Sequence, residues 1–240
     1  MASLYLIPTT LGESTLSDVL PEGNAEVIRR LKHFIVEEER TARRFLKQVD
    51  KAIDIDSLTF YPMGKHSDRG LYLSYLEPLR QGEDMGIVSE AGCPAIADPG
   101  SDIVALAQAE SLEVVPLVGP SSILLSLMAS GFNGQNFAFV GYLPTQPDPR
   151  RQALRKLEAR AYAEHQTQIF IETPYRNEAL LDTMLHTLRP QTRLCIAAGL
   201  TTGGQMVKTR SIDGWKRAGL PSLKKVPTIF LIYAPPAQAH

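Results

Sequence analysis

The chain is poor in the residues from which disulfides and metal sites are built. Its 240 residues include only two cysteines, Cys93 and Cys195, which lie far apart and form no CxxC pair. The five histidines are scattered, and no two of them stand at the spacing of a ligand pair on a helix. We therefore expect two free thiols in a reducing compartment, and no metal site.

An excess of charge of one sign is also missing. The chain has 25 Lys and Arg against 26 Asp and Glu, a formal net charge of -1. No strong overall field favours nucleic acid or acidic ligands, so RNA binding requires a local basic patch. There is no apolar run of about 18 residues, and the segment 1–5 lacks the basic start and apolar core of a signal peptide. These absences predict a cytoplasmic protein without a membrane span.

Several common functional motifs do not occur. The sequence has no G-x-G-x-x-G and no G-x-x-x-x-G-K-[ST], which argues against a standard dinucleotide fingerprint and a P-loop NTPase. It has neither H-E-x-x-H nor G-x-S-x-G, the motifs of one class of zinc peptidases and of α/β-hydrolases.

Short apolar runs alternate with helix-like intervals throughout the chain, and hydrophobic residues make up 44% of it. This alternation favours α/β layers with largely parallel strands. Strands are expected at Leu4–Pro8, Phe34–Val36, Leu58–Tyr61, Met85–Ser89, Glu113–Pro116, Phe137–Val140, Gln168–Glu172, Arg193–Ala198, Gln205–Thr209 and Thr228–Tyr233. Helices are expected at Ser101–Ala109, Ser122–Ala129 and Tyr175–Leu188; in the last, Leu181, Met184, Leu185 and Leu188 share one face.

Turn residues between 117 and 135 indicate the junction of two α/β domains, residues 1–118 and 119–240. A mobile loop is expected at Pro144–Arg151, because Pro144, Pro147 and Pro149 disfavour regular structure.

Four loops rich in Gly, Pro, Ser or Thr follow expected strands: residues 8–12, 89–100, 118–122 and 172–176. Ligands of α/β sheets bind beyond the carboxyl ends of strands, so these loops predict a binding site. Gly92 would let the backbone approach a ligand. Ser121 and Ser122 would either cap the next helix or hold a carboxylate or ribose of the ligand.

At these loops the chain resembles the S-adenosylmethionine-dependent tetrapyrrole methylase superfamily, the class III methyltransferases. Within it, the chain is most similar to the ribosomal RNA small subunit methyltransferase I branch. The segments that carry the resemblance are LYLIPTTLG (4–12), VSEAGCPAIADPG (88–100), VPLVGPSS (115–122), GYLP (141–144) and IFIETPYR (169–176).

The resemblance implies a homodimer of two-domain α/β subunits, with S-adenosylmethionine in a cleft between the two domains. It implies no metal. The residues that it assigns to the cofactor are Pro8, Thr10, Leu11, Gly92, Cys93, Ile96, Ser121, Ser122, Ile171, Glu172, Ala198 and Thr228.

For the methyl acceptor, the resemblance singles out two polar segments. An acidic-Thr-Arg segment of the branch corresponds to residues 37–40, and a His-Asn-acidic segment corresponds to residues 66–68. Glu37, Arg40, His66 and Asp68 are therefore the candidates for the acceptor side. A basic run at Arg150, Arg151, Arg155, Lys156 and Arg160 resembles a basic helix of the branch; it would either contact RNA phosphates or be a solvated helix face.

The chain departs from the branch at a C-terminal strand. The branch carries Arg-Glu-Leu-Thr-Lys where this chain has Ala198-Gly199-Leu200-Thr201-Thr202, and Glu39 and Ser67 also differ from the pattern. The leading hypothesis is 2′-O-methylation of a cytidine in small-subunit rRNA. Two alternatives stay open: a methyltransferase for a small tetrapyrrole-like molecule, and a cofactor-binding paralogue without turnover.

Overall fold

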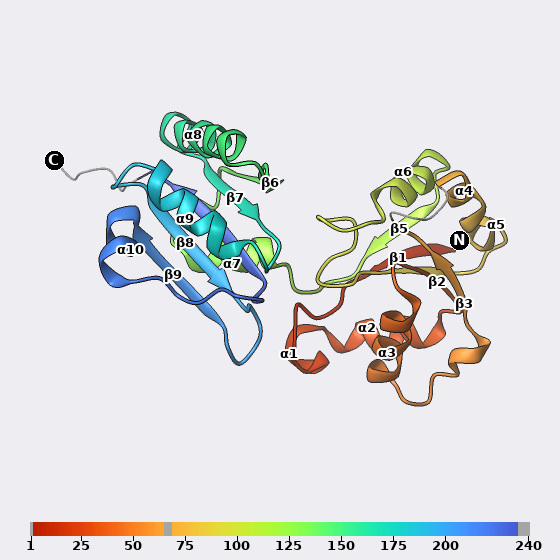
Figure 1. Cartoon of the computed structure of the whole chain (residues 1–240). Helices are drawn as coiled ribbons and strands as arrows, with labels where there is room; N and C mark the ends of the chain where they lie inside the picture. The colour runs from red at the N-terminus through yellow and green to blue at the C-terminus, as the bar shows by residue number, and fades with distance from the viewer. Residues whose placement is uncertain (1, 65–68, 235–240) are drawn as a thin grey trace. The chain divides into compact units, whose positions relative to one another are not determined.

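The computed structural model describes residues 2–64 and 69–234. The chain divides into two compact units, Met1–Ser121 and Ser122–His240. Each unit consists of one five-stranded sheet with helices on its faces (Figure 1). Within the described ranges, no helix combines the length and apolarity needed to span a lipid bilayer. The α/β fold class with two sheets is confirmed.

The sheet of the first unit is entirely parallel, with the strand order β3-β2-β4-β1-β5. The central strand β1 pairs with β4 on one side and β5 on the other. All the strands expected for this unit occur: β1 (Ser3–Ile7), β2 (His33–Val36), β3 (Thr59–Pro62), β4 (Met85–Val88) and β5 (Glu113–Pro116).

Helices cover both faces of this sheet (Figure 1). One face packs Phe34 and Val88 against Ile28 and Phe45 of the helices α2 and α3. The other face packs Met85 against the helices α4 to α6. The helical segments are α1 (Leu16–Val19), α2 (Glu22–Arg30), α3 (Glu39–Val49), η1 (Ile55–Ser57), η2 (Arg69–Leu71), α4 (Tyr72–Tyr75), α5 (Glu77–Arg80) and α6 (Ser101–Ala109).

The sheet of the second unit is mixed, with the order β6-β7-β10-β8-β9. Only β6 and β7 are parallel; β10 is antiparallel to both β7 and β8, and β8 is antiparallel to β9. The expectation of largely parallel strands is wrong here. The short connection 199–205 joins β8 directly to β9, whereas a parallel crossover needs about a dozen residues or more. The strands are β6 (Phe137–Tyr142), β7 (Thr167–Ile171), β8 (Arg193–Ala198), β9 (Met206–Ser211) and β10 (Thr228–Tyr233).

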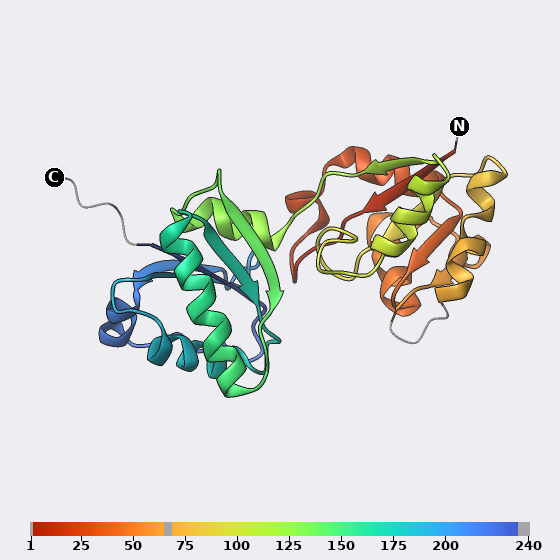
Figure 2. The ribbon, with the colours of Figure 1, turned by 90° about the horizontal axis from the view of Figure 1, so that it is seen from above.

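Helix α7 (Ser122–Ser130) lies on one face of this sheet, and α8 (Pro147–Ala163), α9 (Asn177–Thr187) and α10 (Ile212–Ala218) lie on the other (Figure 2). The expected apolar face of α9 is confirmed. Leu181, Met184, Leu185 and Leu188 are buried, in a core that includes Trp215.

The expectation of a mobile loop at Pro144–Arg151 is wrong, because α8 begins at Pro147. Pro147 and Pro149 stand in the first turn of the helix, where backbone N–H groups have no partner within the helix, so proline is tolerated. The helical hydrogen bonds start at once, since the Arg150 N–H donates to the Gln146 carbonyl over 3.0 Å. The buried Arg150 side chain then fixes the preceding segment by donating to the carbonyls of Pro144 and Thr145.

Candidate functional site

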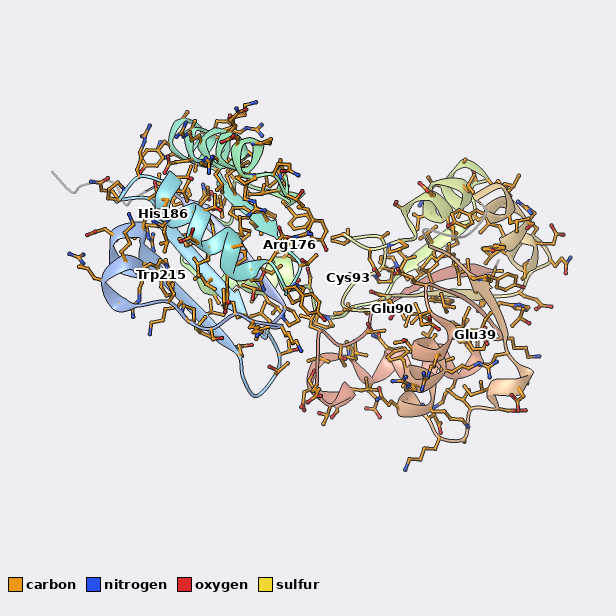
Figure 3. All side chains as sticks on the ribbon, in the orientation of Figure 1. Glu39, Glu90, Cys93, Arg176, His186 and Trp215 are labelled. Atoms are coloured by element: carbon orange, nitrogen blue, oxygen red, sulfur yellow. The ribbon has the colours of Figure 1, made fainter. Side chains whose placement is uncertain are left out.

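The carboxyl ends of β2, β4, β1 and β5 meet at one edge of the first sheet, because these four strands are parallel neighbours. Three of the turn-rich loops seen in the sequence follow β1, β4 and β5 there. In Figure 3, Glu90 and Cys93 mark the loop that follows β4. The edge thus gathers distant segments of the sequence, since Leu6 near the end of β1 pairs with Pro116 at the end of β5.

These three loops contact one another directly. The Thr9 N–H donates to the Gly92 carbonyl over 3.0 Å. The Cys93 thiol donates to the Pro120 carbonyl over 3.6 Å, and burial raises the pKa of this thiol, which favours the protonated form. Gly119 lies so close to Pro8 that an added Cβ would stand 2.2 Å from the Pro8 Cγ. The loops after β1, β4 and β5 therefore form one interlocked group, which we call the triple-loop edge.

Glycine is required at a second contact of the triple-loop edge. Gly92 has a φ of +78°, and a Cβ there would lie 2.9 Å from Leu11 Cδ2 and 3.2 Å from the Pro120 carbonyl oxygen. Ala95 and Ala97 in the same loop also have positive φ values, 63° and 58°. Such conformations cost about 1–3 kcal/mol each and tend to cluster at binding sites.

The triple-loop edge presents apolar side chains and backbone groups. Ile96 and Val118 are 55% and 71% exposed. The hydroxyl of Thr9 is buried and has no hydrogen-bond partner among the residues that the structure describes. Seven of the predicted cofactor residues lie in this group of loops: Pro8, Thr10, Leu11, Gly92, Cys93, Ile96 and Ser121. Ser121 is the last residue of the first unit, and Ser122 begins α7 in the second.

Carboxylates gather next to the triple-loop edge, at the ends of β2 and β4. The Glu38 N–H donates to Glu90 over 3.3 Å, and Ser89 Oγ donates to Asp98 over 2.7 Å. Burial raises the pKa of Glu90, and the charges of Glu37, Asp98 and Glu38 raise it further. Burial also raises the pKa of Asp98.

Glu90 and Asp98 were not among the residues assigned from the sequence. Both belong to the S-E-A-G-C-P-A-I-A-D-P-G segment, so the signal was present. The segment marked the loop, but it did not indicate that both carboxyl groups are partly buried or that Glu90 lies close to Glu37 and Glu38.

Of the predicted acceptor residues, the structure brings two to this edge. Glu37 directly follows β2, and Arg40 is the second residue of α3 with an exposed side chain. The loop after β3 is adjacent, since a Cβ on Gly64 would lie 3.6 Å from Glu37 Cγ. His66 and Asp68 lie outside the described residues.

In the second unit, one end of the sheet gathers the four remaining predicted cofactor residues. Ile171 at the end of β7 pairs with Ile229, and Thr228 at the start of β10 pairs with Ala198 at the end of β8. Glu172 follows Ile171 directly. Thus Ile171, Glu172, Ala198 and Thr228 lie along one edge, which we call the Glu172 edge.

Glu172 is buried, and its two carboxylate oxygens differ. Oε1 accepts from Arg176 Nη2 over 2.7 Å and from the Thr173 N–H over 2.7 Å, whereas Oε2 is buried without a partner in the described part of the chain. Burial raises the pKa of Glu172, but the hydrogen bonds from Arg176 and Thr173 outweigh it and hold the pKa below its usual value. Figure 3 labels Arg176 at this edge.

Asn177 contributes a second unpaired acceptor to the Glu172 edge. Its side chain is fully buried, and its Nδ2 donates to the Val226 carbonyl over 2.7 Å, while Oδ1 has no partner among the described residues. Buried acceptors without donors are costly, so this edge is suited to a ligand that brings N–H groups.

The basic run 150–160 is a helix, α8, but only part of it is available to a ligand. Arg150 is buried, and its guanidinium donates hydrogen bonds to two backbone carbonyls. The alternative that Arg150 contacts an RNA phosphate is therefore wrong. Arg151 pairs with Asp148, and Arg160 lies 3.5 Å from Glu164.

The sequence and the fold are similar to those of known methyltransferases. Residues 14–213 match the family described as Tetrapyrrole (Corrin/Porphyrin) Methylases. The chain is 33% identical over 186 residues to ribosomal RNA small subunit methyltransferase I of Halalkalibacterium halodurans, covering 76% of this chain and 59% of that protein. It is 30% identical over 201 residues to the protein of the same name from Synechocystis, covering 84% of this chain and 68% of that protein. The chain thus spans about three fifths of the length of the first of these relatives.

Solved structures show the same fold. The methyltransferase CobJ superposes with a TM-score of 0.62 at 16% identity, covering 97% of this chain and 93% of that chain. Uroporphyrin-III-C-methyltransferase from Thermus thermophilus superposes with a TM-score of 0.56 at 16% identity, covering 97% and 94%.

Proposed function

The chain belongs to the tetrapyrrole (corrin/porphyrin) methylase family, and from this premise we propose that it transfers the methyl group of S-adenosylmethionine to the 2′-hydroxyl of a cytidine in small-subunit rRNA. The observation that carries the proposal is the triple-loop edge, where Gly92 and Gly119 leave no room for a side chain. The relatives named ribosomal RNA small subunit methyltransferase I support the choice of acceptor. An rRNA acceptor implies a cytoplasmic protein.

The chemistry of the triple-loop edge fits the cofactor. S-adenosylmethionine has an amino acid zwitterion, a sulfonium and an adenosine, so it needs backbone donors and acceptors, hydroxyls and an apolar surface. Thr10, Leu11, Cys93 and Ile96 supply these groups from loops already held in place by their mutual contacts. Pro8 and Gly92 are the points where the loops touch.

The Glu172 edge, taken by itself, also suits the donor groups of S-adenosylmethionine. The unpaired Glu172 Oε2 is suited to accept a hydrogen bond from an amino group, and its anionic form also attracts a cation. Ile171, Ala198 and Thr228 supply the surface beside it. Ser121 and Ser122, at the junction of the two units, complete the proposed set.

Bound S-adenosylmethionine supplies an electrophilic methyl group on its sulfonium. The protein's own contribution is alignment of the acceptor oxygen with that methyl group, for which geometry alone is worth several orders of magnitude. The acceptor hydroxyl must lose its proton as the new O–C bond forms. We propose that Glu37 and Glu90 accept this proton. The pKa of Glu90 is raised, which brings it closer to neutral pH, where a general base works best. Arg40, His66 and Asp68 are proposed to hold the acceptor nucleotide.

The test uses three readouts on the full chain. Titration calorimetry with S-adenosylmethionine measures cofactor binding, and slower alkylation of Cys93 by iodoacetamide in its presence checks the location without any turnover. Radiolabelled methyl transfer to small ribosomal subunits and to deproteinised rRNA then identifies the acceptor. Absence of calorimetric binding would refute the core of the proposal; binding without methylation of either RNA would refute the acceptor.

A second candidate acceptor is a small tetrapyrrole-like molecule. The uncharged segment Ala198–Thr202 and the exposed Ile96 and Val118 favour it. Transfer to a porphyrin precursor but not to rRNA would identify this activity. Binding of S-adenosylmethionine without transfer to either substrate or to a cell extract would identify a paralogue without turnover.

We also propose that the protein is a homodimer, as expected from the resemblance. Light scattering coupled to gel filtration measures the molar mass directly. A mass of one chain at the concentrations used for the activity assay would contradict it.

A further inference from the structure

Helix α3 carries two stripes of opposite character. Ala42, Phe45 and Leu46 are buried in the core of the first unit, and Val49 packs against it. The positions 40, 43, 44 and 47 repeat the same helical spacing on another face, and all four are exposed Arg or Lys. The chain as a whole has a net charge of -1, so this basic stripe is a local feature.

The basic stripe lines an open groove of about 700 Å³. The groove runs along α3, and Ile55 of η1 is the one apolar residue that lines it. Its other lining residues are Glu38, Glu39, Arg40, Arg43, Arg44, Lys47 and Gln48. Four cations against two carboxylates leave the groove positive.

The four cations are not equivalent. Arg43 pairs with Glu39 over 2.6 Å and stacks over the Phe60 ring, and the Lys47 ammonium donates to the carbonyls of Lys51 and Ile53. Arg40 and Arg44, in contrast, form no ion pair with any residue in 2–64 or 69–234. Arg43 and Lys47 are therefore engaged in contacts within the chain, whereas Arg40 and Arg44 are available to a ligand.

We propose that the α3 groove binds the phosphate backbone of single-stranded RNA beside the nucleotide to be methylated. The inference rests on the proposed function, and it adds the surface that holds the acceptor strand. Arg40 and Arg44 stand at i and i+4, with Cβ atoms about 6 Å apart, and a guanidinium can bind a phosphate through two hydrogen bonds. The groove starts at Glu38, whose N–H contacts Glu90 at the proposed site of methyl transfer.

RNA fits this groove better than an acidic protein segment. Protein interfaces depend on a desolvated apolar centre with anchoring side chains. The lining offers only Ile55 for that purpose. Binding of RNA backbone needs no such centre, because release of counterions supplies most of the affinity.

The experiment measures the salt dependence of RNA binding. Fluorescence anisotropy follows a labelled single-stranded RNA oligonucleotide of mixed sequence, titrated with the wild-type chain, Arg44→Gln and the control Lys32→Gln. Lys32 is an exposed residue just before β2, at the opposite end of the first sheet from the triple-loop edge, and among the described residues it has no ion pair. Loss of one phosphate contact should reduce the slope of log K against log salt by about 0.7, and the affinity at 0.1 M salt about fivefold. Lys32→Gln should match wild type.

Three results would overturn the inference: an unchanged slope in Arg44→Gln, an equal loss in Lys32→Gln, or equally tight binding of poly-glutamate to the wild type. The first two outcomes leave the proposed function intact if the wild type still binds S-adenosylmethionine and methylates rRNA. Circular dichroism of Arg44→Gln should match wild type, since no ion pair of the described residues is removed.

Discussion

Gly119 is the position where one added methyl group tests the triple-loop edge most directly. In Gly119→Ala, the new Cβ would lie 2.2 Å from Pro8 Cγ and 2.4 Å from Pro8 Cβ, where ordinary van der Waals contact begins at 3.4 Å. Pro8 cannot swing away, because its ring is fixed to the backbone next to β1. The loops after β1 and β5 must therefore part by more than 1 Å.

Two magnitudes follow from this displacement. Overpacking of a well-packed contact costs about 1–3 kcal/mol of folding free energy. A displacement of about 1 Å in groups that position a substrate can cost about 100-fold in rate. Weaker binding of S-adenosylmethionine should accompany both effects, since Pro8 and its neighbours belong to the proposed cofactor site.

The assay compares wild type, Gly119→Ala and Gly134→Ala. A Cβ added at the control glycine, Gly134, would meet nothing within 4 Å, and its φ is not positive, so this substitution should change stability by less than about 0.5 kcal/mol. Urea unfolding followed by circular dichroism measures stability, and calorimetry measures cofactor affinity. Trp215, the single tryptophan, lies in the second unit, so its fluorescence reports that unit separately. If Gly119→Ala equals the control in both measurements, the loops do not meet as described.

Three further predictions concern charged groups. The pKa of Glu172 is lowered, so its pairing with Arg176 adds to the free energy of unfolding above pH about 4.3. This contribution is lost as the pH falls through the lower folded-state pKa, so the urea midpoints of wild type and Glu172→Gln should differ at pH 7 and converge in acid. The pKa of Glu90 is raised, so the wild type loses stability as the pH rises from the pKa of Glu90 in the unfolded chain to its pKa in the folded protein. Glu90→Gln should therefore unfold at a higher urea concentration than wild type at pH 7 but not at pH 4. The reverse order at pH 7 would contradict the carboxylate cluster. Arg150→Ala should lose about 2 kcal/mol in urea unfolding, because it removes charged donors from the carbonyls of Pro144 and Thr145, whereas the exposed Arg151→Ala should lose less than about 0.5 kcal/mol.

The sequence predicted those parts of the fold that depend on local pattern. Apolar runs bounded by turn residues marked every strand, and the spacing of Leu181, Met184, Leu185 and Leu188 marked the buried face of α9. The loops at 8–12, 89–100 and 118–122 were recognisable because the ends of buried strands need Gly and Pro for their turns. Their convergence on one edge followed from the parallel order of the first sheet.

The other features of the fold and of the site depend on contacts between distant segments, which the local sequence pattern does not encode. An apolar strand such as Thr228–Tyr233 has the same composition in a parallel and in an antiparallel sheet. The sequence therefore does not predict the mixed topology of the second sheet. Pro147 and Pro149 predict a break in regular structure, whereas proline is tolerated there because both residues stand in the first turn of α8. The partial burial of Glu90 and Asp98 results from segments distant in the sequence.

The position of β1 at the centre of the first sheet has a consequence for synthesis of the chain. Strand β1 is synthesised before both of its partners, β4 and β5, which lie about 80 and 110 residues later. Until residue 88 has emerged, both edges of the apolar segment Leu4–Ile7 are unpaired, and one edge stays unpaired until residue 116 has emerged. Pairings of such long sequence separation form slowly and leave strands prone to aggregation. We therefore expect destabilising changes at β4 or β5 to reduce the soluble yield of the protein more than its measured stability indicates.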